Sequence, residues 1–148
     1  MAKDSAPSVR VRSRPDHLWV DDSQFPVIYL RLPEQISEDD VSDLYDYLKL
    51  NILRKRMSYG VVVDATGLRS VPSAAVRQRL ADHEHAVADI ESRYNKANAY
   101  VIASAVLRGA LTAIYWVSPP RYPHAVFPST DRAEAWVRSK LIEAGIRL

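Results

Sequence analysis

The segment Tyr59–Arg79 decides the fold, and it reads Tyr-Gly-Val-Val-Val-Asp-Ala-Thr-Gly-Leu-Arg-Ser-Val-Pro-Ser-Ala-Ala-Val-Arg-Gln-Arg. The three consecutive valines at 61–63 are too few for a helix and predict a strand that is buried on both faces. Asp64 ends that strand, Thr66 and Gly67 form a turn, and Pro72-Ser73 begins a helix, where the missing N–H of a proline costs nothing. These residues place polar groups at the carboxyl edge of a sheet, which is where open α/β sheets commonly bind ligands.

The sequence on either side alternates between strand and helix patterns. A first helix is expected to begin at Ser37 and to end at Arg54-Lys55-Arg56, and Asn95–Asn98 is expected to form a polar turn. Further strands are expected at 17–20, 27–32, 99–103 and 124–127, and further helices from about Ser73 to Tyr94, from Ser104 to Pro119 and from Ser129 to Gly145. The first two strands are close enough for an antiparallel hairpin, whereas the later ones are separated by helices and are expected to be parallel. The sequence therefore predicts an α/β fold with a four- or five-stranded mixed sheet and about four helices.

Length and composition indicate a globular protein. The 148 residues are 47% hydrophobic and 26% charged, which fits one domain, expected over residues 16–148. A formal net charge of +2 is too small to indicate nucleic-acid binding. The absence of cysteine excludes disulfides and thiolate sites, and no run reaches the roughly 18 apolar residues of a transmembrane helix. A cytoplasmic protein is expected.

Residues 1–15 are expected to form a flexible basic arm. They include Lys3, Arg10, Arg12 and Arg14 but a single acidic residue, Asp4. One interpretation is a contact with an acidic partner or an anionic membrane, and the other is a solvated chain terminus.

The loop after the central strand carries the first candidate binding surface. Ser70 and Ser73 lie near a helix N-terminus, where free N–H groups and the helix dipole would stabilise a phosphate, and plain helix capping is the alternative role. The predicted partner-binding or regulatory loop consists of Asp64, Thr66, Arg69, Ser70, Ser73 and Arg77. Asp64 has no partner acid or nucleophile in sequence, so we expect no catalytic residue.

The segment His83-Glu84-His85 suggests a metal site. However, neighbouring helix residues point about 100° apart, so His83 and His85 cannot face the same metal ion. His83 falls on the apolar stripe and is expected at the edge of the core. Asp82, His85 and Asp89 share a helix face, which fits either a weak divalent site or a solvated face. We expect neither a metal nor a cofactor.

A second candidate surface lies on the third helix. Arg108 follows its N-terminus and suits an anion or a carboxylate, whereas Gly109 and Ala110 are small enough for close packing on the sheet. An aromatic and proline cluster at the far end of the helix suits either an interface or a buried sheet end. The possible groove or interface consists of Arg108, Leu111, Tyr115 and Trp116.

The central segment resembles the STAS domain of anti-sigma-factor antagonists, the SpoIIAA-like fold. In that family a central strand ends in Asp, and an Asp-Ser-Ser-Gly motif then begins a helix. When Asp64 is aligned with the strand-end Asp, residues 72–75 fall on the motif. Ser73 then matches the first Ser, Ala74 stands at the phosphorylated Ser, and Pro72 replaces the Asp, so the resemblance supports the fold more than a phosphorylation switch.

The C-terminal half is similar to bacterial STAS/SEC14-type proteins through the segment 103–109, Tyr115-Trp116 and Glu134-Ala135-Trp136. The related CRAL-TRIO fold binds lipids. The two resemblances imply a non-enzymatic protein-interaction or regulatory scaffold with an unidentified protein partner, and a homodimer is one form of it. The alternative function is small-molecule or lipid binding in a groove between the third helix and the sheet.

Overall fold

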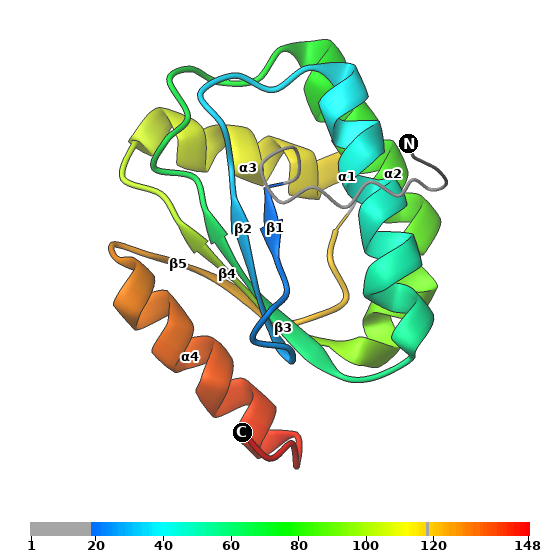
Figure 1. The fold of residues 1–148 in the computed structure, drawn as a ribbon. Coiled ribbons are helices and arrows are strands. Elements are labelled where there is room, and N and C mark those ends of the chain that lie inside the picture. Colours follow the sequence, from blue (N-terminus) through cyan, green and yellow to red (C-terminus); the bar gives the residue numbers. More distant parts are fainter. Residues whose placement is uncertain (1–18, 118) are drawn as a thin grey trace, which may run out of the picture.

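A computed structural model describes residues 19–117 and 119–148, and Figure 1 shows its arrangement of a sheet between helices. The described residues form an α/β fold with a five-stranded mixed sheet and four α-helices, as the sequence predicts. The elements are β1 (Val20–Asp21), β2 (Val27–Arg31), α1 (Glu38–Asn51), the 3-10 turn η1 (Leu53–Lys55), β3 (Tyr59–Asp64), α2 (Ala74–Tyr94), β4 (Asn95–Val101), α3 (Ala105–Val117), β5 (His124–Phe127) and α4 (Thr130–Glu143). The basic arm predicted at 1–15 and the first two residues of the strand predicted at 17–20 lie outside the described residues.

The strands lie in the sheet in the same order as in the sequence. The predicted hairpin is confirmed, since β1 pairs antiparallel with β2, and the other three strand pairs are parallel. In the central register Leu30 lies beside Val63, and Val63 lies beside Tyr100. Each new strand is therefore added on the same side of the previous one.

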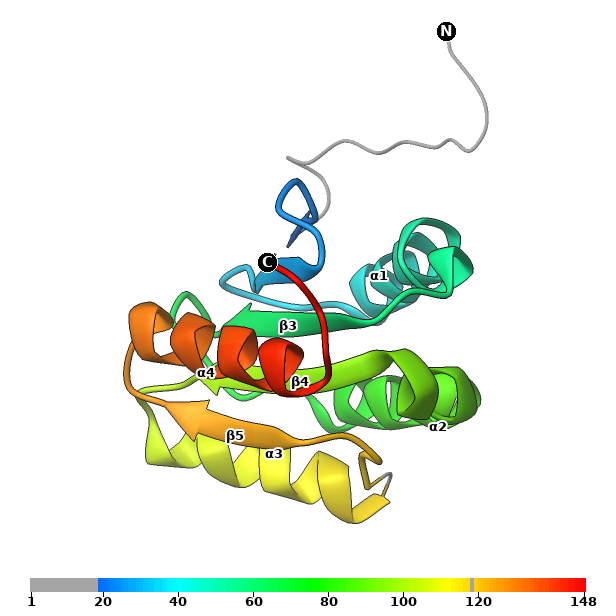
Figure 2. The ribbon, with the colours of Figure 1, turned by 90° about the horizontal axis from the view of Figure 1, so that it is seen from below.

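This order decides where the helices lie. Crossovers of one hand that step in one direction place their helices on the same face of a sheet. α1, α2 and α3 accordingly cover one face in the order of the strands, and α4 covers the other face (Figure 2). The two faces therefore have separate cores.

Alternation along the strands assigns residues to these cores. On the α4 face, Val62 packs with Ala99 and with Val137 and Leu141 of α4, and the two α4 residues are fully buried. β3 and α4 lie so close that a Cβ atom at Gly60 would come within 2.5 Å of a methyl carbon of Val137. Val61 and Val63, the neighbours of Val62 in the sequence, point to the opposite face and contact the cores under α1, α2 and α3.

Four predicted helix starts agree with the structure. Ser37 and Asp40 form a reciprocal capping box at α1, in which the Asp40 N–H donates to Ser37 Oγ and the Ser37 N–H donates to the Asp40 carboxylate. Ser73, Ser104 and Ser129 accept hydrogen bonds from backbone N–H groups at the starts of α2, α3 and α4.

Three local predictions are wrong. α1 ends at Asn51 instead of continuing to Arg54–Arg56, because the chain turns there and buries Ile52 and Leu53. Asn95–Asn98 belongs to β4 and is not a turn, since its two asparagines are buried and bond to each other. Gly109 does not pack on the sheet: it is exposed, and a Cβ atom there would contact nothing within 4 Å.

Candidate functional site

The predicted regulatory loop lies at the carboxyl edge of the sheet, and local contacts hold its side chains. The Asp64 carboxylate accepts hydrogen bonds from the Thr66 N–H at 3.0 Å and the Thr66 hydroxyl at 2.6 Å. Ser73 Oγ accepts from the Val76 N–H at 3.2 Å, which is the capping role. The Arg77 guanidinium donates to the Pro72 carbonyl at 2.6 Å. Each of these groups therefore already stabilises the loop or the helix start.

Thr66, Arg69, Ser70 and Ser73 are the exposed members of this loop, and the Thr66 and Ser73 side chains make the local contacts described above. Arg69 forms an ion pair with Glu34 at 3.2 Å, and both side chains are mostly solvent-accessible. Such a pair is worth little in water. Phosphorylation of Ser70 or Ser73 and recognition of a partner by this loop stay predictions.

The predicted groove residues of α3 separate into two groups. Arg108 is exposed and donates to the Ala103 carbonyl at 3.4 Å. Leu111 and Tyr115 line a cavity together with Leu107 and Ala110. The Trp116 side chain lies outside the described residues.

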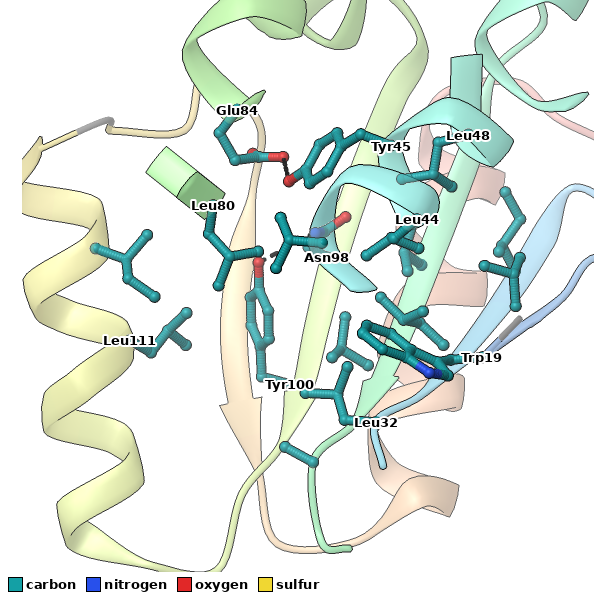
Figure 3. Close-up of a pocket in the computed structure, with 18 of the residues that line it drawn as sticks. Trp19, Leu32, Leu44, Tyr45, Leu48, Leu80, Glu84, Asn98, Tyr100 and Leu111 are labelled. Atoms are coloured by element: carbon teal, nitrogen blue, oxygen red, sulfur yellow. Dashed lines mark hydrogen bonds between the residues drawn. The ribbon is translucent and has the colours of Figure 1, made fainter. Parts of the chain in front are cut away.

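This cavity lies on the α1–α3 face of the sheet. Its volume is about 180 Å³, and it lies between the sheet and all three helices of that face (Figure 3). Figure 3 shows Leu111 from α3, Leu80 from α2 and Leu44 from α1 around it. Most of the walls are apolar side chains. The cavity therefore extends further than the groove predicted between α3 and the sheet.

One end of the cavity carries a partly buried polar network centred on Glu84 of α2, whose own side chain is half-buried. Tyr45 of α1 donates its hydroxyl proton to Glu84 Oε2. Tyr122, which precedes β5, donates to Glu84 Oε1 at 2.9 Å. Both carboxylate oxygens of Glu84 are therefore oriented by tyrosines from other elements.

The network continues along β4. Asn95 Nδ2 donates to Asn98 Oδ1 at 2.7 Å, and Asn98 Nδ2 donates to the Tyr100 hydroxyl at 3.1 Å. The Tyr115 hydroxyl of α3 donates to the Tyr100 hydroxyl. Burial raises the pKa of Tyr100 to about 12, so this hydroxyl stays protonated at neutral pH.

Glu91 is the second carboxyl of the network, and its side chain bonds to Glu84. Glu91 is only 7% exposed. Burial first, and the neighbouring charge of Glu84 second, raise the pKa of Glu91 to about 9. Glu91 therefore holds a proton at neutral pH and can donate it in the hydrogen bond to Glu84.

No positively charged side chain of the described ranges pairs with this carboxyl couple, since neither Glu84 nor Glu91 is in an ion pair there. His83 stacks on the Tyr45 ring at a centroid distance of 4.8 Å, and burial lowers its pKa. This places His83 at the edge of the core, as its position on the apolar stripe indicates.

The metal interpretation of α2 has no support in residues 19–117 and 119–148, where no three metal-ligand side chains gather. Asp82 accepts a hydrogen bond from Gln78 at 2.9 Å. Asp89 pairs with Arg121 at 2.7 Å. These two carboxylates therefore serve local contacts.

Sequence reasoning missed Glu84 and Glu91. Their position in the sequence could have indicated them. Steps of four, three and four residues place them on one face of α2 with two apolar residues, in the order Leu80, Glu84, Val87 and Glu91. Two carboxyls on an otherwise apolar stripe indicate a buried polar site, because acidic residues are rarely buried without a partner.

Comparison with models of known protein families and with curated protein sequences finds no match to this chain. In the part of the chain that the structure describes, no helix combines the length and the hydrophobicity needed to cross a membrane.

Proposed function

We propose that the protein binds a small, largely apolar molecule in the cavity between the sheet and α1, α2 and α3. The observation that carries this proposal is the cavity of about 180 Å³, which has apolar walls and a polar network at one end. Ligand sites combine these two features, because the apolar walls supply affinity and a few polar groups fix the orientation.

The cavity volume limits the size of the ligand. An apolar cavity of roughly 150 Å³ holds benzene, whereas drug-sized ligands fill about 300 Å³ or more. A volume of 180 Å³ therefore suits a molecule with an apolar part of about one ring, and it is too small for a lipid acyl chain with its head group.

The energetic cost of the cavity also favours a ligand. At about 24 cal/mol per Å³, a cavity of 180 Å³ costs at most roughly 4 kcal/mol of stability, because this one is partly open to solvent. The α4 face of the same sheet shows that this chain can pack tightly, since a Cβ atom at Gly60 would lie only 2.5 Å from a methyl carbon of Val137 there. A bound apolar molecule would offset the cost by restoring contacts with the cavity walls.

The second proposal for this chain is a protein-interaction function. This proposal places the protein in the cytoplasm, and a homodimer is one form of the interaction. The support for this proposal is the exposure of Arg69 and Ser70 at the carboxyl edge of the sheet. We propose no catalytic role for either site.

The first test is a methyl NMR titration with toluene, a neutral apolar probe of suitable size. We expect saturable shifts in the methyl signals of Leu80 and Leu111, which line the cavity. The methyl signals of Leu141 should stay unchanged because that residue packs on the opposite face of the sheet. A folded protein whose Leu80 and Leu111 signals do not move would refute the proposal.

A cavity-filling variant makes the test specific. Leu111→Trp places a larger side chain at the cavity wall and should abolish the toluene-dependent shifts. The matched control is Val106→Trp on the same helix, where the native side chain is 67% exposed. Toluene should shift the Leu80 methyl signals of this control as in the native protein. Equal binding by both variants would show that toluene binds elsewhere.

A further inference from the structure

The pair of carboxyls at the end of the cavity constrains the chemistry of the ligand. Glu84 and Glu91 lie one beside the other on α2, and both line the cavity. They bring up to two negative charges into a largely apolar environment. Buried charges in proteins are nearly always paired with an opposite charge or neutralised by a proton.

The surrounding side chains do not supply that opposite charge. Among the described residues that line the cavity there is no lysine, arginine or histidine. The groups nearest to the carboxyls are neutral tyrosines, and Tyr45 and Tyr122 already donate their protons to Glu84. A proton on Glu91 is therefore the charge balance that the protein itself can provide.

A ligand cation can take the place of this proton. An ammonium group has three hydrogen-bond donors and no acceptor, so it needs several acceptors around it. The cavity end offers carboxylate oxygens from Glu84 and Glu91, and it also offers the carbonyl oxygen of Asn98. Hydrogen bonds between charged donors and acceptors are about twice as strong as neutral ones, and they gain further in a buried site.

We propose that the ligand is a small organic cation: an apolar group of about one ring that carries a primary ammonium group, with the ammonium bound at Glu84 and Glu91 and the apolar group among the leucines of the cavity. This inference rests on the proposed function and adds the charge class of the ligand.

Two other ligand classes fit these residues poorly. An anion would meet two carboxyls without a basic side chain among the described lining residues. A divalent metal ion needs more ligands than two carboxyls, and no group of three metal-ligand residues is present in the described part of the chain.

The test compares three probes that share one ring and differ in charge: benzylamine, benzyl alcohol and benzoate, with toluene as the uncharged reference. By isothermal titration calorimetry at pH 7, benzylamine should bind roughly ten- to a hundred-fold more tightly than benzyl alcohol, and benzoate should not bind. Because the ammonium replaces the proton on Glu91, benzylamine binding should release about one proton, which is measured from the binding enthalpies in two buffers of different ionisation enthalpy. Benzyl alcohol should release none.

Variants identify the group that is responsible. In Glu91→Gln, which keeps the side-chain shape, benzylamine should lose its advantage over benzyl alcohol and release no proton. Glu84→Gln provides a second variant in case Glu91→Gln does not fold, and circular dichroism checks folding in both. The matched control is Glu143→Gln at an exposed site of α4, which should keep the preference of the native protein.

The outcomes separate this inference from the proposed function. If toluene and benzyl alcohol bind but benzylamine binds no more tightly than the alcohol, the cationic ligand is refuted and the apolar site stands. If neither toluene nor any of the three charged or polar probes binds, both proposals are wrong. A preference for benzylamine that persists in Glu91→Gln and in Glu84→Gln would also refute the inference, since the charge would then be recognised elsewhere.

Discussion

Glu91 makes stability depend on pH in a direction opposite to that of most acidic residues. Folding raises its pKa from the usual 4.5 to about 9, mainly through burial and then through Glu84. The folded protein therefore keeps a proton that the unfolded chain releases, and stability falls as pH rises through this range. The groups that face Glu91 are Glu84 of α2, Tyr45 of α1, Tyr59 of β3, Tyr115 of α3 and Tyr122 before β5.

We expect the free energy of unfolding to fall by about 2 kcal/mol between pH 7 and pH 9, as measured by urea unfolding. Burial and the nearby carboxyls hold the pKa values of the facing tyrosines above this interval, so these tyrosines do not titrate in it. In Glu91→Gln the fall should nearly disappear because glutamine does not titrate. Equal stability of the native protein at pH 7 and pH 9 would show that Glu91 is not held in its protonated form.

Single residues differ in how well the sequence predicts their roles. Serines that cap helices are predicted correctly at 37, 73, 104 and 129, because capping depends on backbone groups within the next three residues. The pairing of Glu84 with Tyr45 and Tyr122 joins α2 to α1 and to the segment before β5. Such contacts depend on how the helices pack, and the local sequence does not contain that information.

At the scale of elements, β3 and α4 pack closely against each other at Gly60. We expect Gly60→Ala to destabilise the protein by about 1–3 kcal/mol, because its Cβ atom would lie 2.5 Å from a Val137 methyl carbon and the neighbours on that face are fully buried. Thermal unfolding followed by circular dichroism measures this loss.

Two further variants test whether the contact with Val137 causes the loss of stability in Gly60→Ala. Val137→Ala removes the methyl carbon, so Gly60→Ala should cost less in the Val137→Ala background than in the native protein. Gly109→Ala on α3 is the control, since an added Cβ atom there meets nothing within 4 Å and alanine favours a helix. Equal effects of the alanine at positions 60 and 109 would contradict the close approach.

Element boundaries show where local patterns stop being sufficient. The order and type of the elements follow from hydrophobic periodicity and from turn residues. The prediction of a turn at the start of β4 is wrong because asparagines normally favour turns, whereas Asn95 and Asn98 bond to each other inside the protein. The end of α1 was also wrong, because burial of Ile52 and Leu53 turns the chain before the basic run.

At the scale of the whole molecule, the sequence predicts a hairpin followed by parallel strands, but it does not predict that the helices pack differently on the two faces of the sheet. Parallel strands joined by helices, with a hairpin at the start, are confirmed. The crossover rule then assigns α1, α2 and α3 to one face, whereas α4 follows the last strand and lies outside any crossover. The cavity under α1, α2 and α3 depends on how far these helices stand from the sheet, and hydrophobic periodicity does not determine that distance.

This asymmetry predicts unequal costs for the same substitution on the two faces. Leu141→Ala removes a fully buried side chain from the tightly packed α4 face and should cost about 2–5 kcal/mol, because it leaves a new cavity. Leu111→Ala lies beside a cavity that already exists and removes a half-buried side chain, so it should cost less than half as much. Urea unfolding of both variants measures the two costs, with toluene absent from the solution. If the costs are equal, the α1–α3 face is packed as tightly as the α4 face, and the ligand site proposed there loses its physical basis.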